Sequence, residues 1–219
     1  MITLALSGWQ QPHDALKIIA PDALHVNYGA LENTEALWNA LAQHQPETLI
    51  GWSLGGLLAV QAVAKNILRP KKLVLLGAPF QFVASPEFPA GMPQEMWEGV
   101  KKNYAADARA MLAGFLPLIA QGDGQEKDIT AMLQEPLPPG HWGYWLEQLG
   151  ALSCRTIDLS QMPSTLIIHG ENDAVIPPFH ARAFKKSLPN VRVEIWKNCG
   201  HAPHWHDAEK LRERMHVFG

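Results

Sequence analysis

The chain has 219 residues, of which 47% are hydrophobic and 18% are charged. This length and composition suit one globular domain with a sizeable core, and they exclude a largely disordered chain. The net charge of −3 is too small to gather nucleic acid or an anionic membrane surface, so we expect a small-molecule or protein-borne substrate.

The N-terminal stretch 2–6 is apolar, but no basic residue precedes it and Gly8 soon follows, so it predicts a strand rather than a signal peptide. No apolar run approaches the length needed to span a bilayer. Cys154 and Cys199 could form a disulfide. Without a secretory signal, however, we expect two reduced thiols in a cytoplasmic protein.

Segments typical of strands and of helices alternate along most of the chain. We expect strands at 2–6, 24–28, 48–50, 73–76, 164–169 and 191–196. We expect helices at 12–19, 33–44, 53–64, 179–188 and 209–217. This alternation indicates an α/β fold, with a parallel sheet covered by helices on both faces.

The alternation breaks between residues 80 and 158, where no convincing strand is found. Pro-rich turns and helical stretches there carry the aromatic residues Trp97, Tyr104, Trp142, Tyr144 and Trp145. We interpret this segment as a helical cap or lid over the strand ends, and residues 1–79 and 159–219 as the core. Most of these aromatic residues are expected to serve ordinary packing of the helices on the core.

The stretch G-W-S-L-G-G at 51–56 lies between a predicted strand and a predicted helix. A sharp turn there would strain the backbone of Ser53, so glycines are needed at 51 and 55, where side chains would collide with the neighbouring strand and helix. The turn would present the Ser53 hydroxyl at the carboxyl edge of the sheet, beside helix N–H groups that favour negative charge. The bare G-x-S-x-G pattern is common by chance, but this setting favours a catalytic nucleophile.

A serine hydroxyl is a poor nucleophile at neutral pH, so Ser53 needs a base and a third group that orients the base. His201 is the best placed of ten histidines, because it follows the last strand and its loop would reach the same sheet edge. A Cys199–His201 pair is disfavoured, since Ser53 has the better setting. Six histidines without such a placement are expected to be solvated or structural: His13, His25, His44, His141, His180 and His216.

The orienting acid is expected to be Asp173, in the turn that follows the strand ending at His169. Asp158 and Glu171 are weaker alternatives because neither sits at the tip of that turn. The chain order is then Ser, Asp, His, which is the order of the α/β-hydrolase arrangement. No metal is expected, because the spacing of His201, His204 and His206 lacks the cysteine or carboxylate partner of a known zinc pattern.

The negative charge that develops on the substrate needs backbone donors, usually two N–H groups. We expect one from Leu54, which follows the nucleophile, and the other from Trp9, which follows the first strand. Trp9 could equally be a buried aromatic residue, and both roles are compatible. We expect Trp52, Phe80 and Trp142 to line the substrate pocket.

With these motifs the chain resembles the α/β-hydrolase superfamily, and within it the pimeloyl-carrier-protein methyl ester esterases of biotin synthesis. The resemblance is carried by S-G-W at 7–9, G-W-S-L-G-G-L at 51–57, the G-x-x-D-x-x-x-P turn at 170–177 and G-H-A-P at 200–203. It implies the residue roles given above, with Trp9 and Leu54 as the oxyanion hole. It also implies hydrolysis, without a cofactor, of the methyl ester of a pimeloyl group held on acyl carrier protein.

Three features depart from the superfamily pattern. The chain begins at what is normally the third strand, so about six strands are expected, without the usual N-terminal hairpin. Ser7 stands where a histidine is common, which leaves the Trp9 N–H available as a donor. Residues 80–150 carry nine acidic and four basic side chains, a net charge of −5, although acyl carrier proteins are acidic and are usually held by a basic patch. Lys101, Lys102 and Arg109 are the candidates for such a patch.

These observations predict a serine carboxylesterase that acts on a short or medium acyl ester, either a small molecule or one borne on acyl carrier protein. Thioester hydrolysis, lactone hydrolysis and cleavage of a C–C bond by the same residues remain alternatives. Haloalkane dehalogenases and epoxide hydrolases are disfavoured, since they need an aspartate where Ser53 stands. The fold also serves as a ligand-binding receptor with little turnover, which a complete catalytic set argues against.

Overall fold

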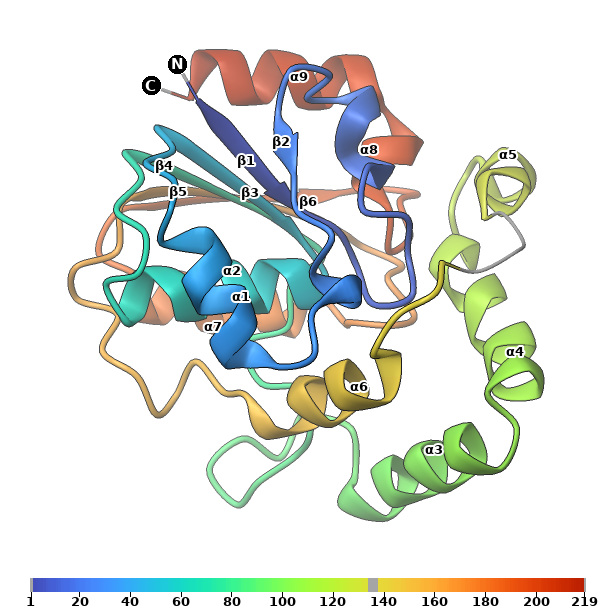
Figure 1. Cartoon of the computed structure of the whole chain (residues 1–219). Coiled ribbons are helices and arrows are strands. Elements are labelled where there is room, and N and C mark those ends of the chain that lie inside the picture. Colours follow the sequence, from blue (N-terminus) through green and yellow to red (C-terminus); the bar gives the residue numbers. More distant parts are fainter. Residues whose placement is uncertain (1, 134–137, 219) are drawn as a thin grey trace.

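The computed structural model describes residues 2–133 and 138–218. Its centre is one sheet of six parallel strands in the order β2-β1-β3-β4-β5-β6 (Figure 1). The strands are β1 (Thr3–Leu6), β2 (Leu24–His25), β3 (Thr48–Trp52), β4 (Lys72–Leu76), β5 (Ser164–Gly170) and β6 (Val191–Trp196). The predicted α/β fold with about six strands is confirmed.

Helices cover both faces of this sheet (Figure 1). On one face lie α1 (Thr34–Leu41), α2 (Leu54–Ala64) and α7 (Phe179–Ser187), and on the other lie α8 (Pro203–His206) and α9 (Ala208–Val217). Between β4 and β5 the chain forms α3 (Gln94–Ala106), α4 (Ala108–Ala120), α5 (Glu126–Met132) and α6 (Trp142–Ala151). These four helices curve around one side of the core, and residues 134–137 of the segment lie outside the described residues (Figure 1).

The strand side chains alternate between two apolar clusters, one on each face of the sheet. In β4, Leu73 and Leu75 join the cluster that contains α2, while Val74 and Leu76 join the one that contains Leu211 of α9. Because both faces are covered, nearly every residue of this strand is apolar and buried. The continuous apolar run in the sequence therefore has a direct structural reason.

Two predicted elements differ most from the structure. Residues 12–19 do not form an α-helix; only a 3₁₀ turn, Ala15–Ile18, is present, and Leu16 is its one buried side chain. The predicted strand 24–28 ends at His25, because Tyr28–Ala30 turn into a second 3₁₀ segment. α1 begins directly after Asn33, whose side chain accepts a hydrogen bond from the Ala36 N–H, and it ends at Leu41, three residues before the predicted end.

The topology brings three loops to one edge of the sheet. Ser53 follows β3, Asp173 follows β5 and His201 follows β6. Since the strands are parallel, their carboxyl ends meet at the same edge, and a site built there can draw on all three loops. Both cysteines are buried free thiols. Across residues 2–133 and 138–218, every helix is too short or too polar to cross a membrane.

Candidate active site

The turn between β3 and α2 holds Ser53 in a backbone conformation that few non-glycine residues adopt, with φ 54° and ψ −123°. Glycines on both sides make the turn possible. A Cβ on Gly51 would lie 2.5 Å from the Gly56 Cα, and a Cβ on Gly55 would collide with the carbonyl oxygens of Leu6 and Ser7. The collisions expected from the sequence are therefore present, with α2 in one case and the end of β1 in the other.

His201 and Asp173 are hydrogen-bonded, with 2.8 Å between His201 Nδ1 and Asp173 Oδ2. The other carboxylate oxygen of Asp173 accepts hydrogen bonds from the N–H groups of Val175 (2.9 Å) and Ile176 (2.7 Å). Burial of Asp173 opposes its ionisation, but the charge of His201 and the hydrogen bonds of His169 and His201 outweigh this and hold the pKa of Asp173 well below the usual range. Asp173 is thus an ionised, immobilised acceptor for His201 Nδ1.

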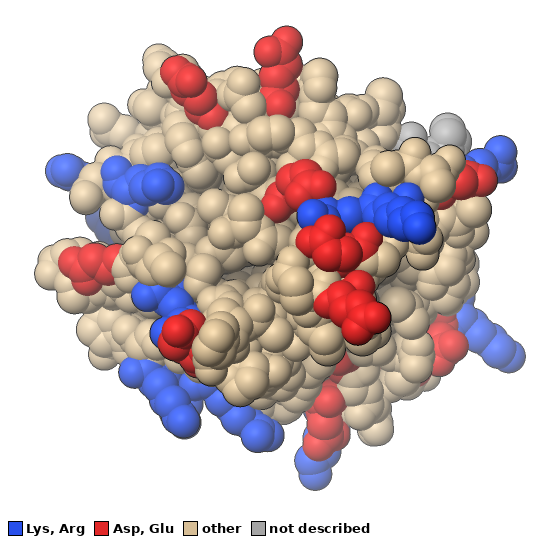
Figure 2. Space-filling model, turned by 90° about the horizontal axis from the view of Figure 1, so that it is seen from below, with Lys and Arg blue, Asp and Glu red and all other residues tan. Residues whose placement is uncertain are grey.

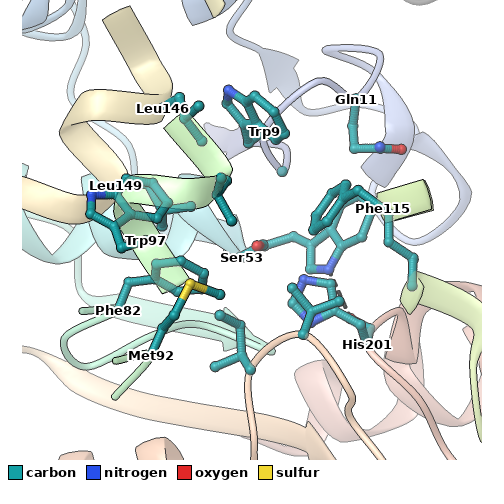
Figure 3. A pocket seen from close by; sticks show the side chains of 16 residues that line it. Trp9, Gln11, Ser53, Phe82, Met92, Trp97, Phe115, Leu146, Leu149 and His201 are labelled. Carbon is teal, nitrogen blue, oxygen red and sulfur yellow. Dashed lines mark hydrogen bonds between the residues drawn. The ribbon is translucent and has the colours of Figure 1, made fainter. Parts of the chain in front are cut away.

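Ser53 and His201 both line a narrow cavity of about 60 Å³ at the carboxyl edge of the sheet (Figure 3). The Ser53 hydroxyl points into this cavity, and the imidazole of His201 forms part of the cavity wall (Figure 3). In the described part of the chain no hydrogen bond joins Ser53 to His201. Such bonds commonly form only when substrate is present.

The walls of the cavity are apolar, and much of them comes from the segment between β4 and β5. That segment supplies Phe82, Met92, Trp97, Val100, Phe115, Ile119, Leu146 and Leu149. The core adds Gly8, Trp9, Gln11, Trp52, Val175 and Ile176. Apart from His201, none of the lining side chains is ionisable. The cavity therefore suits an uncharged, slender apolar group.

Trp9 and Leu54, the two expected oxyanion donors, lie in the turns after β1 and β3. Trp9 lines the cavity, and its indole N–H is already used, since it donates to the carbonyl oxygen of Trp142 at 2.9 Å. Leu54 is the first residue of α2, so its N–H has no acceptor within the helix. Leu54 directly follows Ser53, and Trp9 lines the same cavity as Ser53.

Trp52 lines the cavity as expected, but Phe80 and Trp142 do not. Phe80 packs edge-to-face on Phe184, with 5.0 Å between ring centroids, and Trp142 packs in the same way on Tyr28 at 5.6 Å. The placement of both in the pocket is corrected: each packs on an aromatic residue of the core instead. Two other aromatic residues of the inserted segment, Phe82 and Trp97, line the cavity instead.

The alternative acids lie away from the cavity. Asp158 is exposed, and its carboxylate accepts a hydrogen bond from the Ser160 N–H at 2.8 Å. Glu171 is exposed as well. Neither contacts His201 in any hydrogen bond of the described residues, so Asp173 is the acid that the structure brings to this histidine.

The histidines that follow His201 have other surroundings. His204 is fully buried without a hydrogen-bond partner among the described residues, and burial together with the charge of His201 lowers its pKa to about 3. His206 Nδ1 lies 2.8 Å from Asp123 Oδ1. Asp123, Cys199 and His206 could in principle offer three ligands to a cation. However, the Asp123 oxygens already accept from the N–H groups of Gly200 and Gln125 and contact His206, so the structure gives this carboxylate a role in fixing the loop before His201.

Sequence reasoning missed two contacts to the candidate acid and base. The Trp52 indole N–H donates to the backbone carbonyl oxygen of His201 at 2.9 Å. His169, the penultimate residue of β5, contacts Asp173 through Nε2. The position of His169 just before the Asp173 turn was an available signal, whereas nothing in the sequence indicates the indole contact.

Comparison with known proteins agrees with this architecture. The sequence pattern of the alpha/beta hydrolase family matches residues 5–214. The chain is 31% identical over 225 residues to a pimeloyl-[acyl-carrier protein] methyl ester esterase from Aromatoleum aromaticum, covering 90% of each protein. It is 29% identical over 223 residues to the biotin biosynthesis bifunctional protein BioHC of Cellvibrio japonicus, covering 96% of this chain but only 44% of that protein.

Solved structures show the same fold at lower sequence identity. An esterase from Exiguobacterium antarcticum superposes with a TM-score of 0.80 at 19% identity, covering 100% of this chain and 91% of the esterase. The family match, which spans nearly the whole chain, and the parallel sheet with Ser53 at its strand-to-helix turn lead to one conclusion. The chain belongs to the alpha/beta hydrolase family and is a hydrolase whose relatives include carboxylesterases.

Proposed function

We propose that the protein is a serine carboxylesterase in which Ser53 is the nucleophile, His201 the general base and Asp173 the orienting acid. One observation carries the proposal: the strained turn directs the Ser53 hydroxyl into the cavity that His201 lines, and His201 is hydrogen-bonded to Asp173. Nucleophile, base and acid come from the ends of β3, β6 and β5, so the sheet itself sets their relative positions.

The hydrogen bond to Asp173 decides which ring nitrogen of His201 can act as base. Because the carboxylate accepts a hydrogen at Nδ1, Nε2 carries the lone pair. His201 Nε2 then removes the proton from Ser53 as its oxygen attacks the ester carbonyl, and Asp173 stabilises the resulting imidazolium. His201 next protonates the departing alcohol. A water molecule activated by the same nitrogen hydrolyses the acyl-enzyme and releases the acid.

In this proposal the backbone N–H groups of Trp9 and Leu54 donate hydrogen bonds to the negatively charged carbonyl oxygen of the intermediate. Leu54 opens α2, whose N-terminal dipole adds to the stabilisation. Removal of a single such donor commonly costs a factor of 10²–10³ in turnover, roughly 3–4 kcal/mol.

The cavity and the relatives together suggest the substrate. We propose the methyl ester of an acyl chain borne on acyl carrier protein, because relatives at about 30% identity carry the name pimeloyl-[acyl-carrier protein] methyl ester esterase. The apolar walls supplied by α3, α4 and α6 would hold the methylene chain, and the segment 80–158 would act as the cap over it. A free carboxylate at the buried end would have no cationic partner there, so an ester is preferred to an acid.

The face shown in Figure 2 carries no broad basic field for an acidic carrier. Figure 2 shows a face on which acidic and basic side chains are interspersed. Lys101, one of the three candidate basic residues, is already paired with Glu98 at 3.1 Å and Glu147 at 3.6 Å. Recognition in this proposal therefore rests on the ester and acyl chain inside the cavity more than on the carrier.

The nucleophile is tested with short p-nitrophenyl esters. Ser53→Ala should reduce kcat by roughly 10³-fold or more, because the acyl-enzyme cannot form. Ser160→Ala is the control: it alters an exposed serine that does not line the cavity, and it should leave kcat unchanged. Equal turnover by wild type and Ser53→Ala would refute the proposed nucleophile.

The substrate is tested separately by complementation. A bacterial strain that lacks its pimeloyl-carrier-protein methyl ester esterase should grow without biotin when it expresses the wild-type chain. The same strain expressing Ser53→Ala should not grow. Hydrolysis of small esters without complementation would retain the carboxylesterase and reject the carrier-borne substrate, and a preference for thioesters over methyl esters would indicate a thioesterase.

A further inference from the structure

A second histidine, His169, contacts the candidate acid from inside the core. It lies on β5 with a completely buried side chain, and its Nε2 is 3.3 Å from Asp173 Oδ2 and 2.6 Å from the carbonyl oxygen of Ile176. Asp173 Oδ2 is also the atom that faces His201 Nδ1 at 2.8 Å. One carboxylate oxygen thus lies between two imidazoles.

The surroundings of His169 fix where its hydrogen resides. Both oxygens near Nε2 belong to groups that only accept hydrogen bonds, the Ile176 carbonyl and the ionised Asp173, so Nε2 must be the donor. Nδ1 is buried and has no partner among the described residues. A hydrogen on Nδ1 would be a buried unpaired donor, so the contacts of the ring place its hydrogen on Nε2.

His169 also closes the turn that carries the acid. Asp173 Oδ1 accepts from the Ile176 N–H while His169 Nε2 donates to the carbonyl oxygen of the same residue. These two hydrogen bonds engage the backbone N–H and the backbone carbonyl of Ile176. They hold the Asp173 carboxylate in one orientation. His169 therefore contacts both the backbone of the turn, at Ile176, and the carboxylate of Asp173.

We propose that His169 is a positioning residue that orients Asp173 and moderates its hold on His201, and so sets the lower pH limit of turnover. This inference rests on the proposed function, since it assumes that His201 must be unprotonated to act as base. A donor on Asp173 Oδ2 draws charge away from the His201 side. Without it the carboxylate would favour the protonated imidazole of His201 more strongly, and activity would begin at a higher pH.

The other titratable groups around Asp173 and His201 do not provide this effect. His180 of α7 and His204 of α8 each have a pKa lowered to about 3, chiefly by burial, so both are neutral in the range where esterases are assayed. Burial, with the charges of Asp123 and Asp173, raises the pKa of the Cys199 thiol, which therefore stays protonated. His169 is the remaining histidine in contact with Asp173 among the described residues.

The test compares three variants by the pH dependence of kcat/KM for methyl butyrate, followed by methanol release. His169→Leu removes the donor, and we expect the acid limb to move upward by about half a pH unit, with kcat reduced about tenfold and KM little changed. His169→Gln places an amide N–H near the position of Nε2, so it should restore the wild-type limb. His180→Leu removes a neighbouring buried histidine that does not touch Asp173, and its limb should match wild type.

Coincident acid limbs for wild type, His169→Leu and His169→Gln would overturn the inference, even if kcat fell in all variants. A limb that moves equally in His169→Leu and His169→Gln would overturn it too, because a structural defect would then be the cause. If His169→Leu does not fold, His169→Gln and His169→Asn provide the comparison: the shorter Asn cannot reach Asp173, so its limb should move while that of Gln does not. Ser53→Ala separates the two proposals, since activity in that variant rejects the proposed function itself.

Discussion

The indole of Trp52 donates a 2.9 Å hydrogen bond to the backbone carbonyl oxygen of His201. Trp52 directly precedes Ser53, so this bond ties the turn that carries the proposed nucleophile to the loop that carries the proposed base. The two segments are 149 residues apart in the chain. Their relative position is therefore fixed by a side chain that lies in the cavity wall and takes no part in the proposed proton transfers.

Trp52→Phe should keep the apolar wall but leave the His201 carbonyl oxygen without its donor. An unsatisfied buried acceptor costs about 1–3 kcal/mol, and we expect kcat to fall about tenfold with a smaller change in KM. Trp205→Phe is the matched control, because its indole packs on Trp52 at 5.2 Å but makes no hydrogen bond in the described structure. Steady-state kinetics on a short p-nitrophenyl ester measure both. Equal kcat values for the two variants would show that the indole N–H is unimportant.

Asp173→Asn should reduce kcat by roughly 10³-fold or more, because an amide can present its N–H to His201 Nδ1 and so favour the wrong tautomer. KM should change little, since Asp173 does not line the cavity. Asp158→Asn alters the exposed alternative acid and should keep wild-type kcat. A large loss in Asp158→Asn with retention in Asp173→Asn would reverse the assignment of the acid.

Gly51→Ala should abolish or severely reduce folding, because the new Cβ would lie 2.5 Å from the Gly56 Cα and 2.6 Å from the Gly55 carbonyl oxygen. Both contacts are with backbone, which cannot move aside without opening the turn. Gly99→Ala, inside α3, should raise the free energy of unfolding by about 0.5–1 kcal/mol, since its Cβ would meet nothing within 4 Å and alanine favours the helix. Yield of soluble protein and urea unfolding test this pair. A Gly51→Ala variant as stable as wild type would mean that the turn is less crowded than the structure shows.

His204 should make the wild-type protein less stable in mild acid. Its pKa in the folded state is lowered to about 3, whereas an unfolded histidine titrates near 6.5, so only the unfolded state gains a proton as the pH falls between these values. Between pH 7 and pH 5 this removes up to about 2 kcal/mol from the free energy of unfolding. His204→Phe should lose correspondingly less over that interval.

Urea unfolding at pH 7 and pH 5 measures the effect, with His13→Phe as the control because His13 is exposed. We expect the decrease between the two pH values to be the same in His13→Phe and wild type and smaller in His204→Phe. Parallel decreases in all three proteins would contradict the proton linkage of His204. The buried His180 is present in each of them, so its own linkage cancels in the comparison.

The strand ends were predictable because local patterns determine them. Ser53 sits between an apolar strand and a small-residue helix, and His201 follows the last strand, so a parallel sheet must bring them to one edge. The glycines at 51 and 55 follow from the same turn, since the strain at Ser53 leaves no room for a side chain. Nothing beyond sequence periodicity and turn chemistry was needed to reach these residues.

The cavity walls were not predictable in the same way. Phe80 and Trp142 were expected there, but Trp97 of α3 and Leu149 of α6 line the cavity instead. The sequence of an amphipathic helix shows that one face is apolar, but it does not show which neighbouring element that face packs against. Contacts between residues far apart in the chain decide this, and each inserted helix could satisfy its apolar face in more than one orientation.

By itself, the sequence determined the strand-to-helix turn at Ser53, the order of the parallel elements and the loops from which Asp173 and His201 arise, because spacing and glycine positions encode them locally. The tertiary structure decided the rest: which side chains enclose the cavity, that Trp52 is hydrogen-bonded to the His201 loop, and that His169 contacts Asp173. These contacts depend on how layers pack and on where buried polar atoms find partners, and only the assembled core specifies both.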